Sequence, residues 1–151
     1  MTPDFSLDRA TGADLPAILP LVLDLHNAEH IEMDDGARRS ALLMIIERPE
    51  IGGMWVMRAE GRVIGYAAVA YGFSIVFGGR DAFLDEICIA ADWRGRGIGT
   101  AAIARLKTLL IADDIKALHL EVNKDNEQAQ RLYGGLGFEM RRQYHLMTAE
   151  F

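Results

Sequence analysis

The sequence predicts an α/β fold in which helices flank a mixed, mostly antiparallel central sheet. Two observations favour it. Strand-like and helix-like apolar patterns alternate along the chain as one strand, two helices, three strands and then strand–helix–strand units. The chain has 151 residues, 50% of them hydrophobic and 25% charged, which is typical of one globular domain. We therefore expect a single domain over residues 1–151, with no internal boundary.

The first half of the chain begins with a strand at residues 5–9. A helix then starts at Asp14 and Pro16, because proline is well tolerated in a first helical turn. A second helix over residues 37–47 ends before Pro49. The apolar face of the first helix is formed by Leu15, Ile18, Leu19, Val22 and Leu25.

Residues 54–59 and 62–71 are expected to form strands joined by a Glu60-Gly61 turn. Residues 63–79 carry no charge over 17 positions, which just reaches the lower limit for a membrane span. Interrupting glycines and charged, strand-like neighbours favour two buried strands instead, 62–71 and 73–77, which meet near Gly72.

The second half predicts alternating strands and helices. Ile98, Ala102, Leu106 and Leu109 share one helical face. Asp125 and Gln128 are spaced as a capping box for the next helix. The expected elements are a strand at 82–90, a helix at 98–112, a strand at 117–122, a helix at 125–134 and a final strand at 139–148.

The turn between the strand at 82–90 and the helix at 98–112 reads Arg94-Gly95-Arg96-Gly97-Ile98-Gly99. A strand, a glycine-rich turn and a helix together aim unpaired backbone N–H groups and the positive end of the helix dipole at an anion. Glycines let a phosphate approach closely, and the two arginines add positive charge. The turn is therefore predicted to bind phosphate.

The spacing of the glycines distinguishes between classes of phosphate-containing ligand. The turn lacks the G-x-G-x-x-G of dinucleotide sites and the lysine of a Walker loop. Its Arg-x-x-Gly-x-Gly pattern at Arg94, Gly97 and Gly99 resembles the acetyl-coenzyme A pyrophosphate loop of GNAT N-acetyltransferases. Residues 126–138 resemble a second signature of that family, N-x-x-A-x-x-L-Y-x-x-x-G-F, from Asn126 to Phe138. The resemblance covers roughly residues 55–147.

The resemblance implies acetyl-CoA as cosubstrate, no metal, and direct attack by an amine without an acyl-enzyme. It places Tyr133 as the acid that protonates the leaving thiolate and Asn126 beside the pantetheine arm. A backbone N–H near residues 87–89 would donate a hydrogen bond to the oxyanion of the tetrahedral intermediate. The implied cofactor-binding residues are Ile87, Cys88, Ile89, Arg94, Gly95, Arg96, Gly97, Ile98, Gly99, Thr100 and Asn126.

A catalytic base is needed because only about one alkylamine molecule in a thousand is neutral at pH 7. The candidates are Asp85 and Glu86, in the strand before the turn. Since neighbouring strand residues face opposite ways, we expect only one of them to face the acceptor. In polyamine-type members of the family an acid pair stands here, and its earlier residue, Asp85, is the usual candidate.

His26-Asn27-Ala28-Glu29-His30 matches the inverted zincin pattern H-x-x-E-H, so a metalloprotease is a rival interpretation. It would leave both acetyltransferase signatures unexplained. In the GNAT layout this segment borders the acceptor site, where His26, Glu29 and Asp34 are candidate substrate-binding residues. An acidic rim there would suit a cationic amine.

The formal net charge of −6 argues against nucleic acid and acidic membrane surfaces as partners. Cys88 is the only cysteine, and no signal peptide is recognised, so a cytoplasmic protein is expected.

The favoured partner is a small primary amine. Members of the family are often dimers, so a homodimer is an open expectation. Two alternatives remain: a protein lysine or N-terminus as acceptor, and a non-catalytic acyl-CoA-binding regulatory module.

Overall fold

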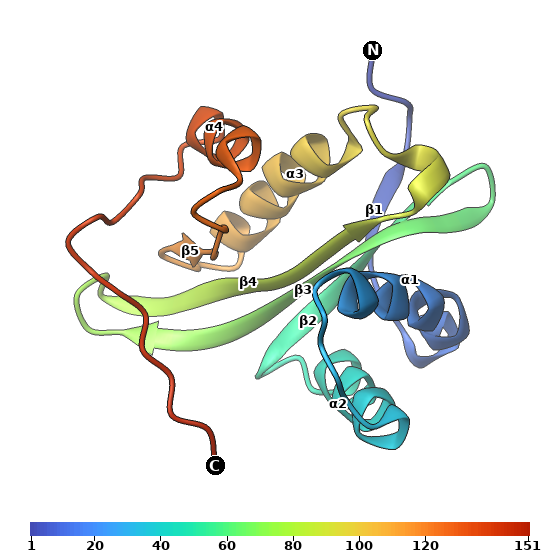
Figure 1. Cartoon of the computed structure of the whole chain (residues 1–151), viewed down its shortest axis with the longest axis horizontal. Helices are drawn as coiled ribbons and strands as arrows, with labels where there is room; N and C mark the ends of the chain where they lie inside the picture. The colour runs from blue at the N-terminus through green and yellow to red at the C-terminus, as the bar shows by residue number, and fades with distance from the viewer. The chain divides into compact units, whose positions relative to one another are not determined.

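The structure, a computed structural model, describes all residues 1–151. They form two compact units, Met1–Glu121 and Val122–Phe151. The first unit contains the sheet and helices α1 to α3, and the second contains helix α4 (Figure 1). The expectation that residues 1–151 fold as one domain stays a prediction.

The sheet has five strands that lie side by side in their order along the chain. Strands β1 to β4 are antiparallel neighbours, and β4 pairs in parallel with β5. The predicted mixed, mostly antiparallel sheet is therefore confirmed. The strands are β1 (Ser6–Arg9), β2 (Gly52–Ala59), β3 (Arg62–Ser74), β4 (Gly79–Ile89) and β5 (Leu118–His119).

Helices flank the sheet. Helices α1 (Leu15–Ala28) and α2 (Asp35–Glu47) contribute to a core cluster with side chains of β2, β3 and β4. Helix α3 (Ile98–Ala112) connects β4 to β5 and lies on the other side of the sheet (Figure 1). Its predicted bounds are confirmed. The cluster under α1 and α2 includes Leu15, Ile18, Val22, Met54, Val56, Tyr66, Ala68 and Cys88.

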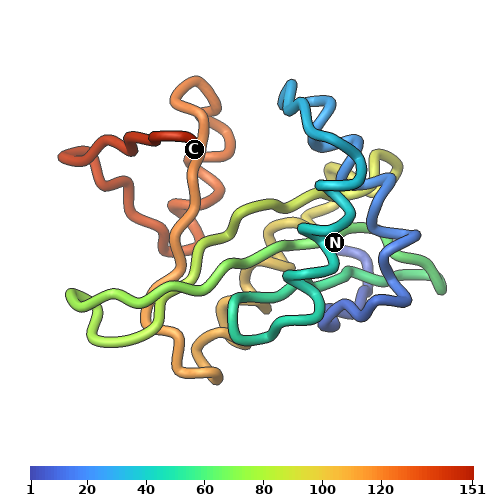
Figure 2. Tube along the Cα trace, turned by 90° about the horizontal axis from the view of Figure 1, so that it is seen from below, coloured from blue at the N-terminus to red at the C-terminus, as the bar shows by residue number.

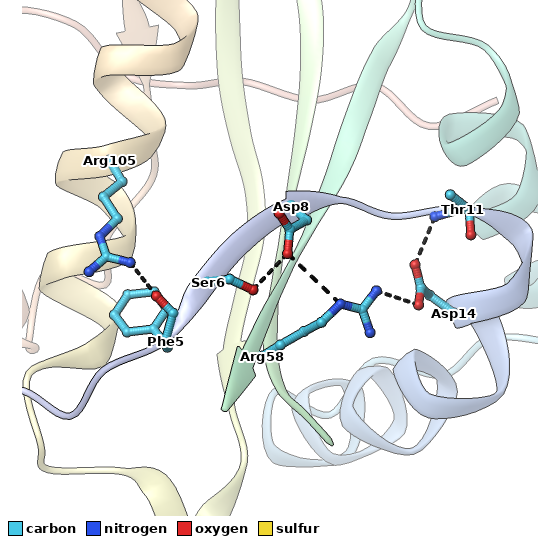
Figure 3. Close-up of polar contacts among 7 residues, drawn as sticks. All are labelled: Phe5, Ser6, Asp8, Thr11, Asp14, Arg58 and Arg105. Carbon is cyan, nitrogen blue, oxygen red and sulfur yellow. Dashed lines mark hydrogen bonds and ion pairs between the residues drawn. The ribbon is translucent and has the colours of Figure 1, made fainter. Parts of the chain in front are cut away.

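Arg58 of β2 joins the first strand to the short 3-10 helix η1 (Gly12–Asp14) (Figure 3). Its Nη2 lies 2.6 Å from Oδ1 of Asp14, and its Nε lies 3.9 Å from Oδ2 of Asp8. Burial acts to raise the pKa of Asp14, but hydrogen bonds from Arg58 and from the Thr11 backbone outweigh it and hold that pKa below its ordinary value. This ion pair therefore fixes the chain just before α1.

The β3–β4 hairpin corrects one prediction. Residues 73–77 do not form a separate buried strand: β3 continues through Gly72 to Ser74, and a turn with Gly78 at φ +75° leads into β4. The hairpin projects at one end of the sheet (Figure 2). Ile75 and Val76 are each 88% exposed, because they occupy the turn rather than a face covered by helices. No helix of the chain is both long and apolar enough to cross a membrane.

The C-terminal part corrects three more predictions. The strand expected at 117–122 is only two residues long, and the one expected at 139–148 is absent. A strand needs a partner edge, which a local apolar pattern does not specify. Helix α4 (Glu127–Gly135) forms, but its cap is Asn126, whose side chain accepts a 3.0 Å hydrogen bond from the backbone N–H of Ala129, rather than the expected pair of Asp125 and Gln128.

Candidate functional site

The predicted phosphate-binding turn connects β4 to α3 in the expected geometry. After β4 ends at Ile89, the 3-10 helix η2 (Ala91–Trp93) leads to Gly97, which stands at φ +77° as the N-cap of α3. No side chain caps this helix. The N–H groups of its first turn therefore remain available to an anion.

The glycines of the turn serve different purposes. Gly95 and Gly97 have positive φ, so the backbone itself requires them. Gly99 does not have positive φ, and an added Cβ would meet only Cγ1 of Ile89, at 3.9 Å. The fold alone would tolerate alanine at 99, so a glycine there leaves space in front of the helix N-terminus.

Both arginines of the turn donate hydrogen bonds to backbone carbonyls that precede it. Arg94 donates from Nε to the carbonyl of Ile89 at 2.8 Å, and Arg96 donates from Nη2 to the carbonyl of Asp92 at 2.9 Å. The guanidinium of Arg96 also lies 4.8 Å from the centre of the buried Trp93 ring. These contacts hold two positive charges beside the start of α3.

Strand β4 has an open edge next to this turn. It pairs with β5 only at Ala82 and Phe83, so its later residues lack a strand neighbour on that side. Backbone groups on this edge are free of sheet pairing, and they include the segment of Ile87, Cys88 and Ile89. Cys88 itself points into the α1 core, where burial raises the pKa of its thiol.

The two candidate bases do not follow simple strand alternation. Ala68 of β3 pairs with Glu86, but the next residue, Val69, pairs with Leu84, which leaves Asp85 as the extra residue of a β-bulge. The register therefore departs from regular alternation at Asp85, and which of the two carboxylates faces an acceptor stays a prediction. Partial burial, then the neighbouring Glu86 carboxylate, raise the pKa of Asp85, and a charged His26 would act in the opposite direction.

Glu86 is held by two side chains. The hydroxyl of Tyr66 donates to Oε1 at 2.8 Å, and Nε2 of His26 lies 2.8 Å from Oε2. Tyr66 has no exposed surface, and its burial, followed by the Glu86 carboxylate, raises its pKa far above the ordinary value. The side chain of Glu86 remains 22% exposed, so an oriented carboxylate reaches the surface of the first unit.

His26 is not a rim residue. It is 5% exposed, and its second ring nitrogen, Nδ1, accepts a 3.1 Å hydrogen bond from Nε of Arg38. It therefore reaches the candidate site only through Glu86. Tyr66 and Arg38 were missed by sequence reasoning, since a tyrosine in an apolar strand and an arginine on a helix carry no local sign of these distant contacts.

The remaining acceptor-side candidates are exposed. Glu29 follows the last residue of α1. Asp34 caps α2 by accepting a 2.9 Å hydrogen bond from the N–H of Ala37, so part of its hydrogen-bonding capacity is structural. His30 lies beyond the end of α1 at φ 56°, which removes the helical spacing that the zinc interpretation required. No group of three or more metal-ligating side chains is present.

In the second unit, Tyr133 lies on α4 and packs edge-on against Phe138, with ring centres 5.9 Å apart. Burial raises the pKa of Tyr133, which favours the neutral phenol. Asn126 uses its side-chain oxygen to cap α4. The roles of both residues toward a cofactor stay predictions.

The comparisons with known proteins agree with this geometry. The sequence model of the Acetyltransferase (GNAT) family matches residues 19–138. An uncharacterized N-acetyltransferase of Mycobacterium tuberculosis is 31% identical over 123 residues, which cover 80% of this chain and 72% of the relative. A thialysine N-epsilon-acetyltransferase of Bos taurus is 31% identical over 75 residues, covering 50% of this chain and 44% of the relative.

Solved structures share the fold. A possible acetyltransferase from Clostridium difficile 630 superposes with a TM-score of 0.85 at 20% identity, covering 97% of each chain. The structure of AAC(6')-Iy with the bisubstrate analog CoA-S-monomethyl-acetylneamine has a TM-score of 0.77 at 18% identity, covering 99% of this chain and 100% of the other. The chain belongs to the GNAT family of acetyltransferases, and it is an acyltransferase with the family's α/β fold.

Proposed function

We propose that the chain moves the acetyl group of acetyl-CoA to a primary amine of a small cationic molecule, by direct attack in a ternary complex. The observation that carries this proposal is the carboxylate pair on β4, just ahead of the anion-binding turn. Glu86 is fixed by two buried donors, and the pKa of its neighbour Asp85 is raised. Paired carboxylates in different environments are a common basis for separate roles.

Acetyl-CoA would be held by its pyrophosphate on the N–H groups at the start of α3. The space beside Gly99 and the two braced arginines support this assignment. The thioester carbonyl would then lie along the open edge of β4, where a backbone N–H near Ile87 to Ile89 stabilises the oxyanion.

Asp85 is the proposed base. Its raised pKa makes it a better match for an ammonium proton than an ordinary aspartate, and its side chain is exposed. Glu86 keeps a fixed negative charge beside it and attracts the cationic acceptor. The neutral amine attacks the thioester carbon, the carbon–sulfur bond breaks, and the extra proton on the nitrogen passes to solvent. Tyr133 gives its hydroxyl proton to the thiolate and is reprotonated from solvent.

A small cationic acceptor is supported by the charge of the chain and by one relative. Exposed acidic residues at Glu29 and Glu32 follow α1, the helix that carries His26, and the whole chain has a net charge of −6. The bovine relative is named for an amine on a small amino acid, thialysine. These features favour a small amine over a protein lysine or N-terminus.

A steady-state acetylation screen over polyamines, aminoglycosides, amino acids and peptides tests the proposal. We expect the highest kcat/KM for small polycationic amines, with a preference that fades as salt screens the rim charges. The Asp85→Asn variant serves as the low-turnover control. A preference for peptides would favour the protein-acceptor alternative, and binding of coenzyme A without turnover of any amine would favour the regulatory module.

A further inference from the structure

Arg38 is a charged side chain that lies buried in the first unit. It lies on α2 and is 6% exposed, whereas arginine in a surface helix normally extends into solvent. Its three nitrogens all have acceptors: Nη1 pairs with the carboxylate of Asp35, Nη2 donates to the carbonyl of Met33 at 3.2 Å, and Nε donates to Nδ1 of His26 at 3.1 Å. Two of these partners are local, and the third belongs to the candidate site.

The contact with His26 determines where the imidazole carries its proton. A guanidinium can only donate, so Nδ1 must present its lone pair to Arg38. A ring that accepts at Nδ1 is neutral and carries its single hydrogen on Nε2, which lies 2.8 Å from Oε2 of Glu86. The close approach of His26 and Glu86 is therefore a hydrogen bond from a neutral ring, although its distance would also fit an ion pair.

We propose that Arg38 is a positioning residue for the acyl transfer: it holds His26 as the neutral Nε2–H tautomer, which orients Glu86 and leaves its negative charge uncompensated beside Asp85. The inference rests on the proposed function for its catalytic consequence, but the tautomer itself follows from the hydrogen bonds alone. Arg38 would thus act on the acceptor site through two intermediate side chains, without touching the substrate.

The alternative state shows why the tautomer matters. An imidazolium at His26 would form an ion pair with Glu86 and cancel the charge that attracts a cationic amine. It would also oppose the raised pKa of Asp85 and so weaken the proposed base. The charged and titratable groups on the elements around the ring are Asp24 and Glu29 near the end of α1, Asp35 and Arg38 on α2, Tyr66 on β3, and Asp85, Glu86 and Cys88 on β4.

Nitrogen-15 NMR of the histidine rings tests the tautomer directly. In the wild-type protein at pH 7 we expect His26 to show an unprotonated Nδ1 and a protonated Nε2, with coenzyme A present or absent. In Arg38→Met, which keeps the side-chain length but removes the donor, Nδ1 should take up a proton as the pH falls. A wild-type ring that is doubly protonated at pH 7, or that carries its hydrogen on Nδ1, would overturn the proposal without any variant.

The pH dependence of kcat/KM distinguishes a positioning role of Arg38 from a purely structural one. Arg38→Met should lower kcat/KM by about 10-fold at pH 6, and the deficit should shrink as the pH rises and the ring becomes neutral again. His26→Gln is the matched control, because its amide can accept from Arg38 and donate to Glu86 but cannot take up a proton. The double variant Arg38→Met/His26→Gln should lose the pH dependence of the deficit.

If Arg38→Met lowered kcat/KM by the same factor at every pH, Arg38 would only support the fold. Failure of the proposed function is distinguishable, since a protein that acetylates no amine would still report the His26 tautomer by NMR. Coenzyme A affinity should be unchanged in all three variants, because the hydrogen bonds of Arg38 and His26 go to Asp35, Met33, Glu86 and each other and not to the turn that precedes α3.

Discussion

The hydroxyl of Tyr66 lies 2.8 Å from Oε1 of Glu86, and the tyrosine that carries it has no exposed surface. A carboxylate that receives this bond on one oxygen and a bond from His26 on the other cannot rotate freely. Its neighbour Asp85 has no such donors among its contacts and sits on a bulge. The pair therefore combines one fixed and one exposed carboxylate, which is the basis for assigning them different roles.

Substitutions of Asp85 and Glu86 should change different kinetic constants. Asp85→Asn removes the proposed base and should lower kcat by ~10²–10⁴, with the largest loss at low pH, where the amine is protonated, and partial recovery as the pH rises. Glu86→Gln should mainly raise KM for cationic amines. It also removes the charge that raises the pKa of Asp85, so the acidic limb of kcat/KM should move to lower pH. Equal, small effects from both variants would remove the pair from the mechanism.

Gly99 gives a clean test of the phosphate-binding turn. Because its φ is not positive and an added Cβ meets no close atom, Gly99→Ala should fold normally and gain up to about 1 kcal/mol of stability from the helix propensity of alanine. If the pyrophosphate uses this space, coenzyme A affinity should fall by about 10-fold or more in calorimetry.

The control is Gly12→Ala, where an added Cβ would meet nothing within 4 Å. Gly97→Val is less informative. It would strain a positive φ and bring Cβ to 2.8 Å from Oγ1 of Thr2, so weaker binding could arise without any ligand contact. Unchanged affinity in Gly99→Ala would place the pyrophosphate elsewhere.

The ion pair between Arg58 and Asp14 should make stability depend on pH. The pKa of Asp14 is held below its unfolded value, so the stabilisation is fully present above the unfolded pKa and is lost as pH falls through the lower, folded value. Thermal unfolding of Arg58→Met should show a loss of about 1 kcal/mol at pH 7 that largely disappears near pH 2. Arg48→Met, which breaks an exposed pair with Glu50, is the control and should change little.

Local patterns in the sequence predicted the elements that depend on local physics. The helix at Ile98–Ala112 was located by its apolar period and by the glycine before it, and the turn by its glycine spacing. The contact of His26 with Glu86 joins residues 60 positions apart, so no local pattern could reveal it. The bulge at Asp85 depends on a register shift against β3, and strict alternation along one strand does not predict such a shift.

The same limit explains the errors in exposed regions. Residues 73–77 are apolar enough for a buried strand, but burial depends on what covers a segment, and here they form the end of a hairpin. The segment 139–148 has a strand-like composition without a paired edge. In both cases the local composition resembles that of a buried strand, but burial and pairing depend on tertiary neighbours that a local pattern does not specify.

Tyr133 belongs to the family signature at residues 126–138 and is the proposed acid for the leaving thiolate. Tyr133→Phe keeps the ring that packs against Phe138 but removes the hydroxyl, so melting temperature and coenzyme A affinity should change little. If this hydroxyl protonates the thiolate, kcat should fall by ~10²–10⁴. Because burial raises the pKa of Tyr133, the wild-type phenol should remain a proton donor to a higher pH than an ordinary tyrosine. A variant with nearly wild-type kcat would leave Tyr133 as a packing residue and require another acid for the departing thiolate.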